Sequence, residues 1–225
     1  MNMQVYKYTH KHSETCVLDV GCGNGSAIRL YAGKNFQTIA RGSGTLHYVG
    51  LDLDSKEINK ANEAWASGRY AKKISCLFYV QDITASLVVG PRTQHVIWCM
   101  ETIEHVPLTK APLVLALMYE ALHPDGRLIL STPAPLGTEL VWPDSHDHEF
   151  NRHETELMLR EAGFKIEDMW GVGCNMRHAK KLLTPERLDM YNKLRLRINP
   201  HVAGTVMQAL YPEMADDLLW VCTKR

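Results

Sequence analysis

Glycines at every second position follow a short apolar run near the start of the chain, in the segment Val17-Leu18-Asp19-Val20-Gly21-Cys22-Gly23-Asn24-Gly25. Glycine reaches positive φ and permits close backbone approach because it has no Cβ. Such a segment is typical of a strand that turns tightly into a ligand-binding loop. The residues from Ser26 to Ala32 then have the pattern of a helix, which we expect Gly33 to end.

The backbone amides at the start of this helix suit a carboxylate or a ribose. A nicotinamide dinucleotide is disfavoured, because its fingerprint G-x-G-x-x-G requires a third glycine where this chain has Ser26. The segment resembles motif I of the class I S-adenosylmethionine (SAM) methyltransferases. That resemblance implies that Asp19 and the loop glycines lie around the methionine part of SAM.

An acidic residue also ends the next predicted strand, at residues 46–52. One carboxylate can accept hydrogen bonds from two adjacent ribose hydroxyls, which suits Asp52. Asp54, with Glu57 three residues later, has instead the pattern of a helix N-cap. We therefore assign the ribose to Asp52 rather than to Asp54.

A third predicted strand, at residues 74–80, is followed by Asp82 and Ile83. The resemblance implies that Asp82 hydrogen-bonds the adenine amino group and that Ile83 packs on the ring, although Asp82 is equally suited to capping a turn. The residues expected around the cofactor are Asp19, Gly21, Cys22, Gly23, Gly25, Asp52, Leu53, Asp82, Ile83 and Cys99.

Strand and helix patterns alternate from Cys16 to about Trp170, which predicts an α/β fold with a doubly wound, seven-stranded, mostly parallel sheet. Thr109 is expected to cap a helix that stops at residues 123–126. Further strands are predicted at residues 95–100, 127–132, 164–170 and 217–222, and the family resemblance implies that the last is antiparallel and lies between strands five and six. We expect a single domain over residues 1–225, with a helical insertion at residues 174–214.

Composition limits the function further. The chain has 225 residues, of which 45% are hydrophobic, with 25 basic and 25 acidic side chains, so no overall basic field favours nucleic acid. Its six cysteines are irregularly spaced without a C-x-x-C pair, which indicates reduced core thiols. No apolar run approaches the roughly 20 residues that span a bilayer, so we expect no membrane partner and a cytoplasmic location.

A second constellation, Glu101-Thr102-Ile103-Glu104-His105, directly follows the fourth strand. In a helical turn its two carboxylates and its imidazole project to one side, where they could hold a divalent cation. Oxygen-rich ligands with one nitrogen suit Mg²⁺ or Mn²⁺ better than Zn²⁺. His146 or His148, after strand five, could complete the site.

The segment from Trp98 to Pro107 is similar to that of the ubiquinone-biosynthesis O-methyltransferases, and its E-x-x-E-H also occurs in the small-RNA 3'-terminal 2'-O-methyltransferases. This resemblance implies metal ligation by Glu101, Glu104, His105 and His148. A structural role, in which the Glu-His pair supports the loop over the sulfonium, stays open beside it. Catalysis is expected to involve His105, His148 and Glu104, with a histidine as the base if no metal binds.

The leading interpretation is a SAM-dependent methyltransferase that acts on a hydroxyl of a small molecule. The alternatives are an RNA or nucleotide 2'-O-methyltransferase and a non-catalytic SAM-binding partner protein. The insertion has seven basic and two acidic side chains between Cys174 and Arg197, which would suit an anionic acceptor, but we favour a solvated helix surface as the explanation of this charge. The oligomeric state is not predicted.

Overall fold

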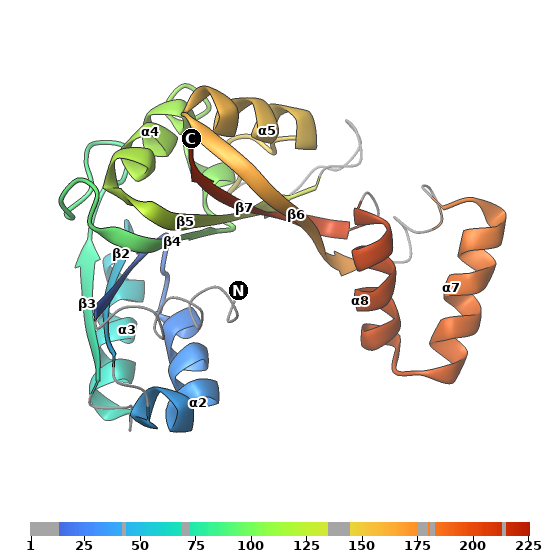
Figure 1. The fold of residues 1–225 in the computed structure, drawn as a ribbon, viewed down its shortest axis with the longest axis horizontal. Helices are drawn as coiled ribbons and strands as arrows, with labels where there is room; N and C mark the ends of the chain where they lie inside the picture. The colour runs from blue at the N-terminus through green and yellow to red at the C-terminus, as the bar shows by residue number, and fades with distance from the viewer. Residues whose placement is uncertain are drawn as a thin grey trace.

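The computed structural model of the chain describes residues 14–41, 44–68, 73–134, 145–174, 180, 183–212 and 215–225. A seven-stranded sheet forms its centre, with the strand order β3-β2-β1-β4-β5-β7-β6 (Figure 1). The strands are β1 (Glu14–Val20), β2 (Thr45–Asp52), β3 (Ile74–Val80), β4 (Gln94–Met100), β5 (Leu122–Pro133), β6 (Phe164–Cys174) and β7 (Ala215–Lys224).

The first five strands of this sheet are parallel, and β7 is antiparallel to both β5 and β6. This confirms the predicted doubly wound fold and the position of the last strand. Because strand order reverses between β1 and β4, the loops at their carboxyl ends diverge and leave room for a ligand.

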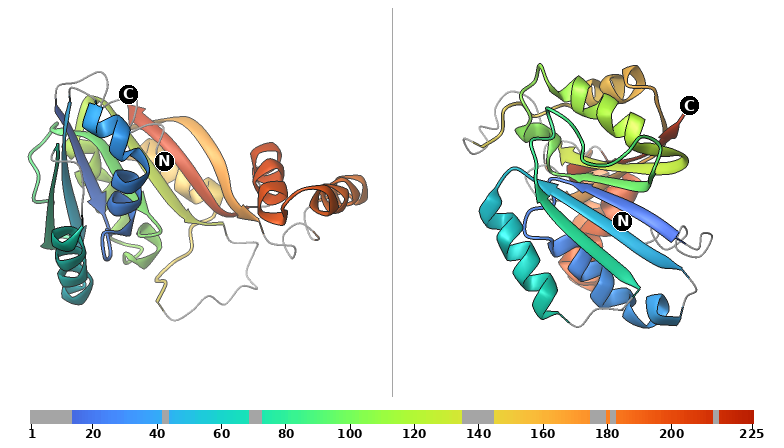
Figure 2. Two further views of the ribbon diagram at one scale, coloured as in Figure 1. Left: turned by 90° about the horizontal axis from the view of Figure 1, so that it is seen from below. Right: turned by 90° about the vertical axis from the view of Figure 1, so that its left-hand side faces the viewer.

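Helices cover the two faces of the sheet (Figure 2). One buried apolar cluster joins the sheet to α2 and α3, and a second joins it to α4 and α5. Two further helices, α7 and α8, follow β6 and project beyond the end of the sheet (Figure 1). The helices are α2 (Ser26–Arg41), α3 (Ser55–Ser67), α4 (Ala111–Ala121), α5 (Arg152–Glu161), α7 (Pro185–Arg197) and α8 (Pro200–Leu210).

Local signals predicted some helix ends correctly and others wrongly. Asp54 caps α3 by accepting a hydrogen bond from the Lys56 amide, as predicted. Gly33 does not end α2, which continues to Arg41, because one exposed glycine costs a helix only about 1 kcal/mol. Thr109 is not the cap of α4 either, since the capping position is Lys110 and no side chain bonds there.

The α7 and α8 helices form a small apolar core of their own, built from Leu183, Tyr191, Ala203 and Met207. The predicted helical insertion is therefore present where the structure describes it. The basic residues Arg177 and Lys181 of this segment lie outside the described residues. Within the part of the chain that is described, no helix has both the length and the apolar character needed to cross a membrane.

The glycine loop tests how strongly the backbone geometry constrains the sequence. Gly21 and Gly23 both have positive φ, at 76° and 51°. A Cβ on Gly21 would lie 2.2 Å from the Thr102 Oγ1 atom, whereas a Cβ on Gly23 would meet nothing within 4 Å.

We predict that Gly23→Ala lowers the free energy of unfolding by about 1 kcal/mol, through backbone strain alone, and Gly21→Ala by about 3 kcal/mol. Urea unfolding of both variants checks this, and equal losses would contradict the steric argument.

Candidate functional site

The glycine loop and the end of β2 form one hydrogen-bonded unit. The backbone amides of Gly21 and Cys22 donate to the carbonyl oxygen of Leu51, at 2.8 and 2.9 Å. The Gly23 amide donates to the Asp52 Oδ2 atom at 2.8 Å, and the Asp54 amide donates to its Oδ1 atom at 2.9 Å. These bonds hold the Asp52 carboxylate at the edge of the loop, where we predicted from the sequence that the ribose binds.

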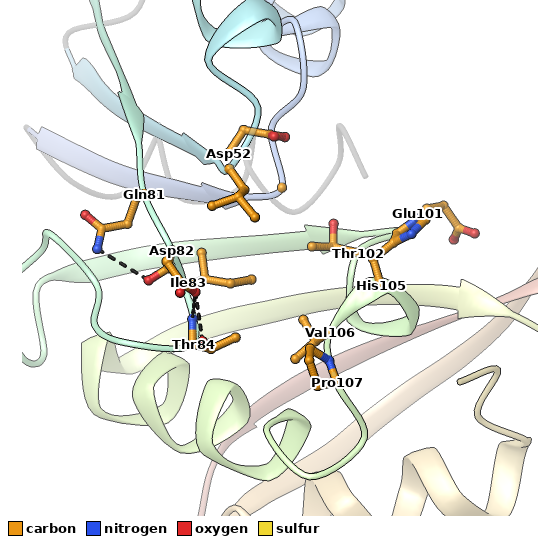
Figure 3. Close-up of a pocket in the computed structure, with 12 residues that line it drawn as sticks. Asp52, Gln81, Asp82, Ile83, Thr84, Glu101, Thr102, His105, Val106 and Pro107 are labelled. Carbon is orange, nitrogen blue, oxygen red and sulfur yellow. Dashed lines mark hydrogen bonds between the residues drawn. The ribbon is translucent and has the colours of Figure 1, made fainter. Parts of the chain in front are cut away.

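A cavity of about 460 Å³ lies beside this unit, at the carboxyl ends of the parallel strands (Figure 3). Five of the ten predicted cofactor residues line it, namely Gly21, Asp52, Leu53, Asp82 and Ile83. Leu53 is 71% exposed, so its apolar side chain is available to cover a ligand. The other lining residues were not predicted as site residues, although three of them lie in the segment from Trp98 to Pro107: Gln81, Thr84, Thr102, Val106 and Pro107.

Asp82 has the turn-capping geometry that was the alternative to adenine binding. Its Oδ1 atom accepts hydrogen bonds from the Thr84 amide and the Thr84 hydroxyl, both at 2.8 Å. These bonds lower the pKa of the Asp82 carboxyl. Because Asp82 also lines the cavity, capping and ligand binding are compatible, with Oδ1 used by the turn and Oδ2 directed elsewhere.

The remaining predicted cofactor residues do not line the cavity. Asp19 is only 3% exposed and lies beneath the loop, with Cys22 buried beside it. Cys99 is completely buried in the core on the α4 face of the sheet, so its side chain is removed from the expected cofactor set. Gly23 and Gly25 shape the loop from positive φ rather than facing the cavity.

The other end of the cavity holds the acidic and histidine constellation. Glu101 has a φ of 51°, and a 3-10 helix, η1 (Ile103–His105), follows it. The Thr102 hydroxyl lies 3.1 Å from the carbonyl oxygen of Val20 and 3.0 Å from that of Met100. This buried side chain therefore ties the end of β4 to the end of β1, which brings the constellation beside the glycine loop.

Residues 145–150 fold back onto this turn through backbone hydrogen bonds. The amides of Asp147 and His148 donate to the Glu104 carbonyl oxygen, at 2.8 and 3.2 Å. The Leu108 amide donates to the Asp147 carboxylate at 2.8 Å. The packing of this segment against η1 decides which histidine approaches Glu104.

Ligand atoms of Glu104, His105 and His146 lie within 4.8 Å of one another. The predicted set of Glu101, Glu104, His105 and His148 is thus replaced, among the described residues, by a group that contains His146. The His148 Nε2 atom instead lies 3.5 Å from the Glu154 carboxylate, and its ring packs on Phe150. The expectation that His148 joins the cluster is wrong, because the His148 side chain contacts Glu154 and Phe150 instead.

Both clustered histidines have partners that fix their rings. His105 Nδ1 lies 2.7 Å from the carbonyl oxygen of Ser145, so this nitrogen carries the proton. His146 Nδ1 lies 2.9 Å from the Glu149 carboxylate. In neutral rings held this way, Nε2 carries the lone pair and can act as a metal ligand or as a base.

Glu101 takes a different direction, away from Asp52 and Asp82 (Figure 3). It accepts a hydrogen bond from the Ser131 hydroxyl at 2.5 Å and also hydrogen-bonds the Asp217 carboxyl on β7. Asp217 was not identified from the sequence, because more than 100 residues separate it from Glu101 and only the sheet order brings them together.

Burial shifts the proton equilibria of these acids. The Glu104 side chain is 1% exposed, and neither of its carboxylate oxygens makes a hydrogen bond of normal geometry with the described residues, although the Thr132 hydroxyl and the backbone at Glu104 interact with the carboxyl and oppose the rise in its pKa. Burial raises its pKa to about 8, and the nearby Glu101 carboxylate adds to the shift. Burial also raises the pKa of Asp217 to about 7. A buried carboxylate without a partner is costly unless a positive ligand compensates it.

Comparison with known proteins defines the family. A family model described as a methyltransferase domain matches residues 7–168. A ubiquinone biosynthesis O-methyltransferase from Xylella fastidiosa is 30% identical over 200 residues, covering 82% of this chain and 74% of that protein. The chain therefore belongs to the methyltransferase domain family, and it is a SAM-dependent methyltransferase.

Solved structures share the fold at low sequence identity. A SAM-dependent methyltransferase from Methanosarcina mazei is 16% identical, with a TM-score of 0.61 over 97% of this chain and 96% of that one. A small RNA methyltransferase is 15% identical, with a TM-score of 0.63 over 100% of this chain and 25% of that one. These likenesses confirm the predicted Rossmann-like methyltransferase fold.

The buried Glu104 carboxyl leads to a prediction about stability. A folded-state pKa near 8, against roughly 4.3 in the unfolded chain, means that folding retains a proton, so stability falls as pH rises through this interval. Glu104→Gln cannot ionise and avoids that loss. Without metal, we expect this variant to be more stable than the wild type by about 2 kcal/mol at pH 8.5 and equally stable near pH 5.

Urea unfolding in the presence of a chelator, repeated between pH 5 and 8.5, measures this difference. Glu149→Gln serves as the matched control, because Glu149 is the carboxylate that hydrogen-bonds His146. A difference in the free energy of unfolding between Glu104→Gln and the wild type that does not change with pH would contradict the raised pKa of Glu104.

Proposed function

We propose that this methyltransferase transfers the methyl group of SAM to a hydroxyl of a small molecule, and that a divalent cation bound at Glu104, His105 and His146 assists the transfer. The observation that carries this proposal is the buried Glu104 carboxylate, which has no ion-pair partner among the described residues and lies beside two oriented imidazoles. The relative named for O-methylation supports the choice of a hydroxyl acceptor.

The cofactor is proposed to lie along the cavity from Asp82 to Thr102. Asp52 would accept the ribose hydroxyls, while Leu53 and Ile83 would enclose the nucleoside. The Asp19 carboxylate, beneath the loop, would stabilise the α-ammonium group of the methionine part. This arrangement would direct the sulfonium methyl toward the end of the cavity that Glu101 and His105 line.

Methyl transfer from a sulfonium is an in-line displacement, so much of the acceleration comes from alignment of the acceptor oxygen with the methyl carbon. The acceptor must also lose its proton. A bound cation would supply charge that lowers the pKa of the acceptor hydroxyl. Without a bound cation, His105 would instead accept the proton, since its Nδ1 proton is donated to the Ser145 carbonyl and Nε2 is left to accept.

The donor set bears on which cation is expected. The sequence suggested two carboxylates with one imidazole, which favours Mg²⁺ or Mn²⁺. One carboxylate with two imidazoles has more nitrogen, and it shifts the preference toward Mn²⁺ or Zn²⁺. We therefore propose Mn²⁺ as the first cation to test.

The two neighbouring histidines provide a matched pair of variants. We predict that His146→Ala lowers kcat/KM at least 100-fold and that His148→Ala changes it less than fivefold, because only His146 belongs to the Glu104 cluster. Initial rates with SAM, Mn²⁺ and a panel of phenols, catechols and aliphatic alcohols measure this. Chelation should reproduce the loss in the wild type while the affinity for S-adenosylhomocysteine stays within a few fold.

The opposite ranking of the two variants, or full activity with chelator, would remove the cation from the proposal. Activity without a cation would leave His105 as the general base. No product with any acceptor, despite tight binding of S-adenosylhomocysteine, would favour the non-catalytic alternative.

A 2'-O-methyltransferase of RNA is the second candidate, because the E-x-x-E-H segment is shared with such enzymes and a small RNA methyltransferase shares the fold. The charges of the insertion give it little support. Lys193 pairs with Asp189 at 2.6 Å, and the guanidinium groups of Arg187 and Arg195 lie over tyrosine rings. We expect binding to short RNA to be weak at 150 mM salt, and a steep salt dependence of tight binding would reverse this choice.

A further inference from the structure

The Asp19 carboxylate has a single hydrogen-bond donor among the described residues. The Tyr48 hydroxyl donates to its Oδ2 atom at 2.5 Å. Both side chains are almost fully enclosed, with 3% of Asp19 and 1% of Tyr48 exposed. They stand on neighbouring strands, since Tyr48 pairs with Val17 and Asp19 pairs with Gly50, so the pairing of β1 with β2 sets their separation.

The Tyr48 ring is itself fixed by two aromatic neighbours. Its centroid lies 5.6 Å from that of Phe78 on β3 and 6.0 Å from that of Trp98 on β4. The rings are tilted by 59° in both pairs, an arrangement that aromatic side chains favour. The Tyr48 ring is therefore held rigidly while its hydroxyl contacts Asp19, so the Tyr48 side chain loses little conformational entropy when a ligand binds.

We propose that Tyr48 is a positioning residue for the cofactor, whose hydroxyl fixes the Asp19 carboxylate beneath the glycine loop so that its negative charge stabilises the α-ammonium group of SAM. This inference rests on the proposed function, which places the methionine part of SAM next to Asp19. It adds a residue outside the cavity lining and outside the recognised motifs.

The charges around Asp19 make this interaction dependent on pH. Burial raises the pKa of Asp19 to about 7, the Tyr48 hydrogen bond opposes the rise, and the Asp52 carboxylate adds to it. The thiols of Cys22 from the loop and Cys99 from β4 also interact electrostatically with Asp19. None of these groups is a cation, so the ligand's ammonium group supplies the compensating charge.

The ligand's ammonium group binds best when Asp19 is ionised. Below pH 7, binding of the ligand is therefore accompanied by release of a proton from Asp19. Affinity should rise with pH while Asp19 ionises, and fall again when the ligand's own amine, with a pKa of roughly 7.7 to 8.0, loses its proton. The acid limb of this profile reports on Asp19 and the alkaline limb reports on the ligand, which provides an internal reference.

The test is calorimetric titration of S-adenosylhomocysteine into the wild type and Tyr48→Phe between pH 5.5 and 9. Loss of a hydrogen bond to a charged group should move the acid limb up by about one pH unit, which weakens binding about tenfold at pH 6. The alkaline limb should not move. An analogue of S-adenosylhomocysteine without the α-amino group should bind both proteins equally at every pH.

Two controls separate positioning from a merely structural role. Tyr31→Phe removes another buried hydroxyl whose ring also packs on Trp98, and it should leave the acid limb in place. Asp19→Asn should abolish the acid limb. The double variant, Asp19→Asn with Tyr48→Phe, should bind S-adenosylhomocysteine with the same affinity and pH dependence as Asp19→Asn alone. Urea unfolding of each variant establishes that it is folded.

The possible failures differ from one another. If Asp19→Asn retains the acid limb, the placement of the methionine part beside Asp19 fails, and the inference fails with it. If Asp19→Asn removes the limb but Tyr48→Phe leaves it unmoved, or weakens binding equally at every pH, only the role of Tyr48 is overturned.

Discussion

Parallel pairing of β1 with β2 is the constraint on which the cofactor pocket depends. The register places Val20 beside Leu51, so the chain that leaves β1 must turn directly over the end of β2. Two loop amides then bond to the Leu51 carbonyl, and a third bonds to the Asp52 carboxylate. This turn requires positive φ at Gly21, with the Thr102 side chain packed so closely that a Cβ would not fit. The glycine loop, the Asp52 carboxylate and the end of β4 are therefore fixed by one set of contacts.

Acidic side chains are concentrated at the same edge of the sheet, and this concentration opposes folding. Burial raises the pKa of Asp19 and Asp217 to about 7 and that of Glu104 to about 8. A chain optimised only for stability would replace such groups with apolar residues. Their presence at the carboxyl ends of β1 and β4 and at the amino end of the antiparallel β7 indicates that positively charged groups bind there, and the ammonium group of SAM is the one proposed for Asp19.

Patterns that act within a few residues were reliable guides to this fold. Alternating apolar residues located the strands, and the Asp54 and Glu57 pair located the start of α3, because each signal is local. The failures involve packing between distant segments. Nothing near Gly33 shows that α2 continues to Arg41. The choice of His146 over His148 depends on backbone bonds to Glu104, and the contact between Glu101 and Asp217 depends on the sheet order. Cys99 adjoins the site in sequence, but strand alternation turns it into the core.

The same acids restrict how a hydroxyl acceptor could be activated. Among the described residues that line the cavity there is neither lysine nor arginine, whereas Glu101, Asp52 and Asp82 are present. An acceptor oxygen that loses its proton there becomes an anion beside carboxylates, and this raises its energy. Positive charge must compensate it, and the described part of the site could supply this charge either from a protonated His105 imidazole or from the cation proposed to bind at Glu104, His105 and His146. The sulfonium adds a positive charge of its own, which the reaction removes. An anionic acceptor would require still more compensation, so the geometry favours a neutral acceptor whose proton leaves only as the methyl group arrives.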